Sequence, residues 1–179
     1  MKILANDGIS QSGIDDLTAA GFEVLTTTVA QEQLENFINT ENVVALLVRS
    51  ATTVRQDLID ACPNLKIIGR GGVGMDNIDV EYAREKGLSV INTPAASSES
   101  VAELVFAHLF SGVRFLYDSN RTMPLEGESK FKNLKKAYAK GTELRGKTLG
   151  VIGFGRIGQA TAKMALGLGM KVIAFDPFL

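Results

Sequence analysis

The stretch 149–158 constrains the fold of this chain more than any other part of the sequence. It begins with an apolar run that predicts a buried strand, and it ends with the spacing GxGxxG at Gly153, Gly155 and Gly158. A helix-like run follows, and residues 171–176 then predict a second strand that ends in a carboxylate. A strand, a glycine turn, a helix and a second strand form a βαβ unit, from which parallel sheets are built.

Each glycine of this motif has its own physical reason. Gly153 permits a tight turn, Gly155 lets a pyrophosphate approach the backbone, and Gly158 lets the helix pack closely on the strand. A helix that begins near Arg156 offers free N–H groups and the positive end of its dipole to an anion. Asp176 stands where a carboxylate accepts bonds from an adenosine ribose and repels a 2′-phosphate, which favours NAD over NADP. The pattern predicts a dinucleotide site; the alternative is a glycine-rich turn in which Asp176 is an ordinary strand-end residue.

Composition narrows the class of protein. Of the 179 residues, 45% are hydrophobic and 22% are charged, as in ordinary globular domains, and the net charge is −1. This charge offers no general attraction for nucleic acid or for an anionic membrane, so we expect neither as a partner. The longest fully apolar run, 43–48, is too short to cross a bilayer, and the first residues become polar too early for a signal peptide. Because Cys62 is the only cysteine, we expect no internal disulfide and no metal site, in a cytoplasmic protein.

The first 94 residues alternate between strand and helix patterns. Strands are predicted at 3–5, 23–27, 43–48, 65–68 and 88–91, and helices at 10–21, 31–38, 54–61 and 80–86. This alternation predicts a parallel sheet with helices on both faces, and ligands of such sheets lie beyond the carboxyl ends of the strands. The segments that follow those ends are 6–8, 49–52, 69–76 and 92–94.

The pattern changes after Pro94, and we expect a domain boundary near 94–98. A long helix is predicted from about Ser98 to Tyr117, followed by a polar, lysine-rich loop over 118–141 without clear periodicity. These lysines are interpreted as a solvated loop, although one of them approaching the anionic substrate of a neighbouring subunit stays open. His108 is the only histidine, and because it shares an apolar helical stripe we assign it no catalytic role.

The loop 69–74, GRGGVG, is a candidate anion site. Four glycines in six residues would allow consecutive backbone N–H groups to converge on a carboxylate, and Arg70 could add a bidentate contact. Arg49 follows another strand and is expected at the same sheet edge. Two arginines there suggest a small substrate with more than one negative charge, such as a phosphorylated acid. The alternative is a glycine loop required for tight packing, with both arginines in surface ion pairs.

Taken together, these segments resemble the D-isomer-specific 2-hydroxyacid dehydrogenase family. The similarity covers the whole chain, and within the family it is strongest to the branch that acts on 3-phosphoglycerate. The motifs that carry it are VRSAT at 48–52, GRGGVGMDNID at 69–79, NTP at 92–94, SVAEL at 100–104 and GTELRGKTLG at 141–150.

The resemblance implies an α/β protein with a flavodoxin-like, parallel-sheet substrate domain over 1–95 and the first part of a Rossmann NAD-binding domain over 96–179. Implied substrate-binding residues are Arg49, Ser50, Arg70, Gly72, Val73 and Gly74. Implied NAD-binding residues are Gly153, Gly155, Arg156, Ile157, Gly158 and Asp176. Val73 stands where the family often has threonine, which removes any hydroxyl contact to the cofactor at that position.

The resemblance also implies an activity for the whole protein. It is the NAD-dependent oxidation of 3-phosphoglycerate to 3-phosphohydroxypyruvate in serine biosynthesis, by a homodimer that associates through the cofactor domain. The arginine, glutamate and histidine that the family's reaction needs have no counterpart here, so we expect no catalytic residue in this chain and no activity from it alone. Two alternatives stay open: a dehydrogenase or reductase of glyoxylate, hydroxypyruvate or D-lactate, and a non-catalytic NAD-sensing module like the corepressors that share this fold.

Overall fold

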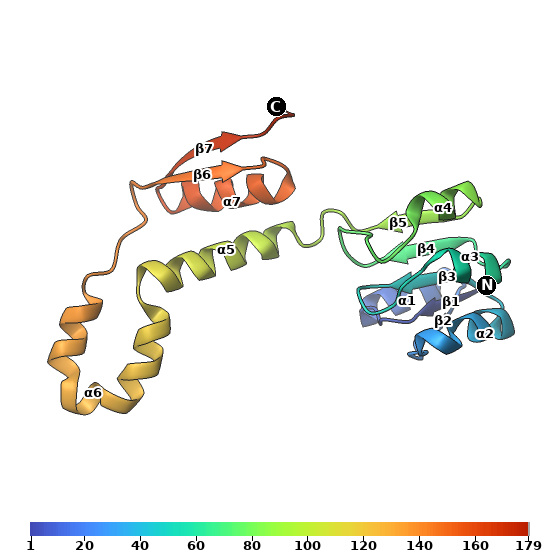
Figure 1. Ribbon diagram of the computed structural model, residues 1–179, viewed down its shortest axis with the longest axis horizontal. Helices are drawn as coiled ribbons and strands as arrows, with labels where there is room; N and C mark the ends of the chain where they lie inside the picture. The colour runs from blue at the N-terminus through green and yellow to red at the C-terminus, as the bar shows by residue number, and fades with distance from the viewer. Residues whose placement is uncertain (179) are drawn as a thin grey trace. The chain divides into compact units, whose positions relative to one another are not determined.

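The computed structural model describes residues 1–178, which divide into two compact units, Met1–Ala96 and the part of the chain from Ser97 onward (Figure 1). The first unit contains β1 (Lys2–Ala5), α1 (Gln11–Ala19), β2 (Glu23–Leu25), α2 (Gln31–Glu41), β3 (Val43–Val48), α3 (Gln56–Ala61), β4 (Ile67–Arg70), α4 (Val80–Glu85) and β5 (Ser89–Asn92). Strand and helix thus alternate, as the sequence predicted.

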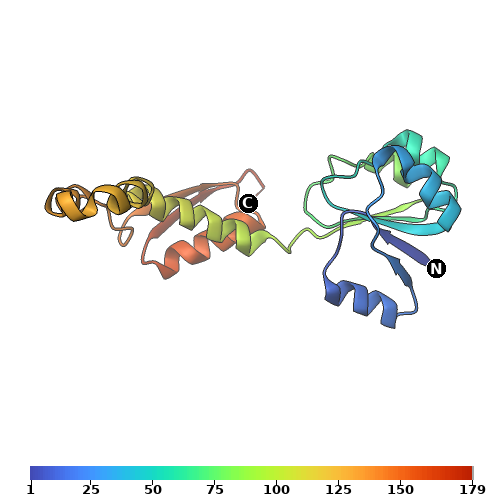
Figure 2. The same cartoon turned by 90° about the horizontal axis from the view of Figure 1, so that it is seen from below.

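The five strands of the first unit form one parallel sheet in the order β2-β1-β3-β4-β5. This is the flavodoxin-like order, in which the direction of winding reverses between β1 and β3. Helix α1 covers one face of the sheet, and α2, α3 and α4 cover the other (Figure 2). The predicted α/β fold class with helices on both faces is confirmed.

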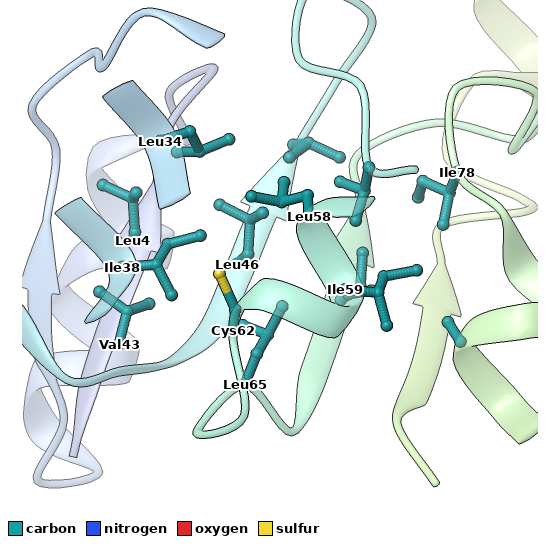
Figure 3. Packing of buried hydrophobic residues seen from close by; sticks show 14 of the residues in the cluster. Leu4, Leu34, Ile38, Val43, Leu46, Leu58, Ile59, Cys62, Leu65 and Ile78 are labelled. Carbon is teal, nitrogen blue, oxygen red and sulfur yellow. The ribbon is translucent and has the colours of Figure 1, made fainter. Parts of the chain in front are cut away.

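The core of the first unit lies between the sheet and the helices α2 to α4. Leu4 and Leu46 from the sheet meet Leu34 and Ile38 of α2, and all four side chains are fully buried (Figure 3). Helix α3 adds Leu58 and Ile59. The strands read as nearly continuous apolar runs because a parallel sheet is covered on both faces.

The second unit contains α5 (Ser98–Val113), α6 (Leu116–Tyr138), β6 (Thr148–Ile152), α7 (Arg156–Gly167) and β7 (Lys171–Phe175). Strands β6 and β7 pair in parallel, with Gly150 opposite Ile173, and α7 connects them as the glycine motif predicted. Its core is a cluster of Phe106, Leu144, Ala165 and Met170.

The prediction of a long loop over 118–141 was wrong, because most of this segment belongs to α6. None of the α6 residues is buried, and a helix without a buried face has no apolar periodicity to reveal it in the sequence. Lys130, whose backbone leaves helical geometry, kinks it. The predicted helix 98–117 is also divided, because Phe115 adopts a left-handed conformation with φ of 56° between α5 and α6.

No helix in residues 1–178 is both long enough and apolar enough to cross a membrane. Some predicted bounds shift by one to three residues, as is common at the ends of elements. Strand β4, for example, begins at Ile67 rather than at Leu65 and continues to Arg70.

Candidate functional site: an anion pocket and a glycine turn

A pocket of about 650 Å³ lies in the first unit, at the carboxyl ends of β1, β3, β4 and β5. Its polar lining includes Asp7, Arg49, Arg70, Asn92 and Thr93, one or two residues from each strand end. Its apolar wall includes Ile9, Leu47 and Ile91. The structure therefore brings together the four segments that follow the predicted strands, at the edge of the sheet where ligands of this fold class bind.

Arg49 follows β3 and extends its side chain over Gly71 at the pocket. Its carbonyl accepts hydrogen bonds from Arg70 Nε at 3.1 Å and from Asn77 Nδ2 at 3.0 Å. No carboxylate of the described residues lies within ion-pair distance of its guanidinium. The backbone of Arg49 is thus fixed, while its charge is available to a ligand.

Arg70, at the end of β4, is held more firmly. Only 14% of its side chain is exposed, and its guanidinium lies 3.6 Å from the carboxylate of Asp76, whose side chain is 88% exposed. An ion pair with such an exposed carboxylate is screened by water and contributes little. Two guanidinium groups therefore give this pocket a positive character, which suits an anionic ligand.

The glycines of segment 69–74 form no left-handed turn, and only Gly69 and Gly74 lie close to neighbouring side chains. None of them has a positive φ, and a side chain at Gly69 would strike Leu47, while one at Gly74 would lie 3.0 Å from Arg70 Nη1. If the N–H groups of this segment converge on an anion, as the sequence predicts, they do so without left-handed glycines.

Some of the amides in this loop are already used. Gly71 and Gly72 donate their N–H groups to the carbonyls of Val48 and Arg70, at 2.9 and 3.0 Å. The N–H groups of Val73 and Gly74 have no partner among the described residues. These two amides are the ones free to bind a carboxylate. Ser50, Gly72, Val73 and Gly74 do not line the pocket, which on this side is bordered by Arg49, Arg70 and Gly71.

Asp7, the second residue after β1, was given no role from the sequence although its segment follows a strand end. Its Oδ2 accepts the N–H groups of Arg49 at 2.6 Å and Thr52 at 3.1 Å, and its Oδ1 accepts the hydroxyl of Thr52. Partial burial acts to raise the pKa of Asp7, but the bonds from the Thr52 hydroxyl and from the amides of Arg49, Thr52 and Ala51 outweigh it, so this pKa is lowered.

Asn77 is the second residue that sequence reasoning missed. It is only 6% exposed, and its Nδ2 donates to the carbonyls of Arg49 and of Thr52, the latter at 2.6 Å. Its Oδ1 is buried without a partner among the described atoms. The sequence shows only an asparagine in a loop that follows a strand. Asparagine is so common in loops that its presence there does not indicate a role.

The three glycines of the turn in the second unit differ in what a side chain at each position would meet. Gly153 has a φ of 91°, a left-handed value that glycine adopts without strain. A Cβ on Gly158 would collide with the carbonyl oxygen of Gly153, whereas a Cβ on Gly155 would meet nothing within 4 Å. The space beside Gly155 is thus open to a ligand, and no described side chain caps the first turn of α7, which begins at Arg156.

Asp176 follows β7 and lies beside the same turn. Its Oδ1 accepts the N–H of Phe178 at 2.9 Å and its Oδ2 accepts the N–H of Phe154 at 2.6 Å. These bonds, first from Phe178 and then from Phe154, lower the pKa of Asp176. The carboxylate is therefore a structural anchor of the glycine turn. Ile157 is partly exposed on the first turn of α7.

Outside the pocket and the glycine turn, the described residues form no further candidate site. His108 is exposed on α5. Among residues 1–178, no group of histidine, cysteine, aspartate and glutamate side chains is arranged to hold a metal ion.

Three known proteins illustrate what this chain is similar to. A relative from Thermotoga maritima, named hydroxypyruvate reductase, is 50% identical over 155 residues, which are 87% of this chain and 48% of that protein. A D-3-phosphoglycerate dehydrogenase from Methanocaldococcus jannaschii is 43% identical over 179 residues, which are 100% of this chain and 33% of that protein. The crystal structure of NAD⁺-bound 3-phosphoglycerate dehydrogenase from Entamoeba histolytica superimposes with a TM-score of 0.73 at 30% identity, covering 100% of this chain and 55% of that one.

The chain thus spans about a half and a third of the lengths of these two relatives. The family model described as D-isomer specific 2-hydroxyacid dehydrogenase, catalytic domain, matches residues 3–170. As the motifs of the sequence predicted, the chain belongs to the D-isomer specific 2-hydroxyacid dehydrogenases.

Proposed function

We propose that the whole protein oxidises 3-phosphoglycerate to 3-phosphohydroxypyruvate with NAD as the hydride acceptor. The observation that carries this proposal is the pair of guanidinium groups, from Arg49 and Arg70, at one pocket on the carboxyl edge of the sheet. A phosphorylated 2-hydroxy acid has two anionic groups, and it is matched by two cations and two free amides better than a singly charged acid. The name of the relative from M. jannaschii supports the same substrate.

In this proposal the first unit, Met1–Ala96, serves as the substrate domain. Arg49 and Arg70 bind the phosphate, and the N–H groups of Val73 and Gly74 bind the carboxylate. Ser50, Gly72, Val73 and Gly74 lie in the segments that border the pocket rather than in its lining, and in this proposal they contact the substrate where it extends beyond the arginines. The charges attract the substrate, and the amides fix the orientation of its C2 atom.

In this proposal the second unit, from Ser97 onward, binds NAD. The glycine turn fits a pyrophosphate because the space beside Gly155 is open and the first turn of α7 is uncapped by side chains. Gly153 and Gly158 shape the turn, while Arg156 and Ile157 supply the first amides of the helix. Asp176 faces the ribose, and its negative charge disfavours a 2′-phosphate. When bound, NAD supplies the hydride chemistry at C2.

We assign no catalytic residue to this chain. Among these 179 residues we identify no arginine, glutamate and histidine that would orient the substrate and move its proton, so we propose that this chain alone is inactive. The whole protein is proposed to be a cytoplasmic homodimer. Exposed Val101, Leu104 and Val105 form an apolar stripe on α5 that suits a contact between cofactor domains.

A second candidate function is the reduction of hydroxypyruvate. It is favoured by the identity of 50% to the relative from T. maritima that carries this name. Hydroxypyruvate has no phosphate, so this candidate requires only one anion-binding group in the pocket. The two arginines favour the phosphorylated substrate.

Steady-state turnover by the whole protein separates these functions. For reduction, we expect kcat/KM to be at least about 10-fold higher for 3-phosphohydroxypyruvate than for hydroxypyruvate or glyoxylate, because a charged hydrogen-bonded pair contributes about 1.5–3 kcal/mol. For oxidation, we expect the same preference for 3-phosphoglycerate over D-lactate. Arg49→Ala should remove most of this preference. Arg84→Ala, which removes an exposed arginine of α4 outside the pocket, is the matched control.

Faster turnover of hydroxypyruvate, with no effect of Arg49→Ala, would establish the second candidate instead. A protein that binds NAD yet turns over none of these acids would leave the NAD-sensing, corepressor-like module.

A further inference from the structure

The negative charge of Asp7 is unexpected in a pocket that is proposed to bind an anionic substrate. It is a carboxylate with a lowered pKa, and so ionised at neutral pH, in a pocket whose other charged groups are two arginines. A negative charge there repels an anionic substrate, so electrostatics alone offers no reason for its presence. Its hydrogen bonds suggest another reason.

The carboxylate of Asp7 is directed to the backbone of the turn after β3. It accepts the amide of Arg49 at one side of the turn, and the amide and hydroxyl of Thr52 at the other. Thr52 is itself held by Asn6, whose Nδ2 donates to the Thr52 hydroxyl oxygen at 2.8 Å. Asp7 thus fixes the position of this turn relative to β1.

The other side of the Arg49 residue is fixed from β4 and the loop after it. The carbonyl of Arg49 accepts Nε of Arg70 and Nδ2 of Asn77. The backbone of Arg49 is therefore held at its N–H by Asp7 and at its carbonyl by two further groups. Its guanidinium has none of these restraints, so its reach into the pocket is set by the backbone from which it extends.

We propose that Asp7 is a positioning residue of the anion pocket: by binding the amides of the turn it places the Arg49 guanidinium, and so strengthens the binding of a phosphorylated substrate despite its own negative charge. The inference rests on the proposed function, because it requires that Arg49 binds the phosphate. It goes further in naming a residue that acts through Arg49 and in giving the sign of its effect.

The direction in which substrate affinity changes when Asp7 is replaced distinguishes a positioning role from a direct electrostatic one. Asp7→Asn removes the charge, and its amide group places N–H donors against the donors of the turn, so at most one oxygen still accepts. A positioning role predicts weaker binding of 3-phosphoglycerate, by about 10-fold, since bonds to a charged acceptor are lost. A purely electrostatic role predicts tighter binding.

The experiment measures the Kd for 3-phosphoglycerate by calorimetry on the whole protein and on four variants. Asp76→Asn is the matched control, because it removes the same charge near Arg70 from a carboxylate that is largely exposed, and it is expected to tighten binding slightly. Arg49→Ala and the double variant Asp7→Asn/Arg49→Ala complete a double-mutant cycle. If Asp7 acts through Arg49, the double variant binds no more weakly than Arg49→Ala alone.

Turnover supplies a readout that a general loss of structure would not reproduce. Asp7→Asn should raise KM for 3-phosphohydroxypyruvate several-fold more than for hydroxypyruvate, because only the former has the phosphate. Equal effects on both substrates, unchanged or tighter binding in Asp7→Asn, or additive effects in the cycle would each overturn the inference. If instead Arg49→Ala leaves the affinity unchanged, the proposed function fails first and the inference fails with it.

Thr52→Ala provides a second test of the inference if Asp7→Asn does not fold. It removes one donor to Asp7 and leaves every charge of the pocket in place. A smaller loss of affinity in the same direction supports the positioning role, and an unchanged affinity contradicts it.

Discussion

Two glycines of the turn after β6 stand three residues apart and differ in what excludes a side chain from them. At Gly158 the obstacle belongs to the protein, since a Cβ would overlap the carbonyl oxygen of Gly153. At Gly155 the protein leaves open space, and the backbone φ of −70° is accessible to every residue. Only a bound ligand would make Gly155 necessary.

This difference predicts opposite phenotypes for two alanine substitutions. Gly158→Ala should lower the free energy of unfolding by about 1–3 kcal/mol, because the overlap is with backbone and cannot relax by a side-chain rotation. Gly155→Ala should change it by less than about 0.5 kcal/mol yet weaken NAD binding. Urea unfolding and NAD titration of both variants measure these effects, and a Gly155→Ala protein that keeps its NAD affinity would contradict the proposed cofactor site.

Asp176 illustrates why sequence reasoning left two interpretations open at one residue. The alternatives were a ribose contact and an ordinary strand-end residue. In the structure the carboxylate accepts the amides of Phe154 and Phe178, which a strand-end residue does, but Phe154 belongs to the glycine turn itself. An anchor for the turn and a group next to the ligand can be the same carboxylate, and the spacing of residues does not distinguish them.

Among the helices and strands, those with buried side chains were predicted more accurately than those without. Strand β3 was predicted at its observed bounds because all its positions face core or helices and form one apolar run. Helix α6 was missed because it buries no residue, and its lysines and glutamates occur in loops as often as in exposed helices. The predicted glycine loop over 69–74 begins only at Gly71, because Gly69 and Arg70 belong to β4, and the close contact of Gly69 with Leu47 joins residues that are distant in sequence.

The candidate site shows the same division. The strand ends that meet at the pocket followed from the alternation of elements. The roles of Asp7 and Asn77 did not, because both act on the backbone of Arg49, 42 and 28 residues away in the chain. Hydrogen bonds over such separations leave no periodic signal.

The two faces of β6 and β7 differ in a way that mutation can measure. One face packs on helices, whereas Ile173 on the other is 65% exposed. Ile173→Ala should therefore change the free energy of unfolding of this chain by less than about 0.5 kcal/mol. Leu46→Ala in β3, where the side chain is fully buried, should cost about 2–5 kcal/mol. Urea unfolding compares them, and equal costs would mean that Ile173 is covered in solution.

For the molecule as a whole, charge sets the pH range of stability. The pKa values of Asp7, Asp60 and Asp176 are all lowered, in Asp60 chiefly by hydrogen bonds from Lys86 and Tyr82. A lowered carboxyl pKa contributes stability above the unfolded value of 3.8, and this stability is lost as the pH falls through the folded value. The contribution of these three carboxyl groups is therefore lost only as the pH falls below about 4.

The alkaline limit has a different origin, in the buried thiol of Cys62 (Figure 3). Burial, and to a smaller extent the charge of Glu35, raises the pKa of Cys62 from 9.0 to about 11. Between these two values the unfolded chain loses the proton while the folded chain keeps it, so stability falls as the pH rises. The lysines with raised pKa values, Lys2 and Lys86, affect stability only above 10.5, so the thiol acts first.

We therefore expect the free energy of unfolding to decrease by about 2 kcal/mol from pH 9 to pH 11, since a difference of one in pKa corresponds to about 1.4 kcal/mol and the thiol is half ionised in one of the two states at each limit. Cys62→Ala should start from a lower stability at pH 7, because it leaves a small cavity, but lose much less of it over this range. Urea unfolding at pH 7, 9, 10 and 11 measures both slopes. Parallel slopes for the two proteins would show that the thiol has the same pKa in the folded and the unfolded chain, or that another group governs alkaline unfolding.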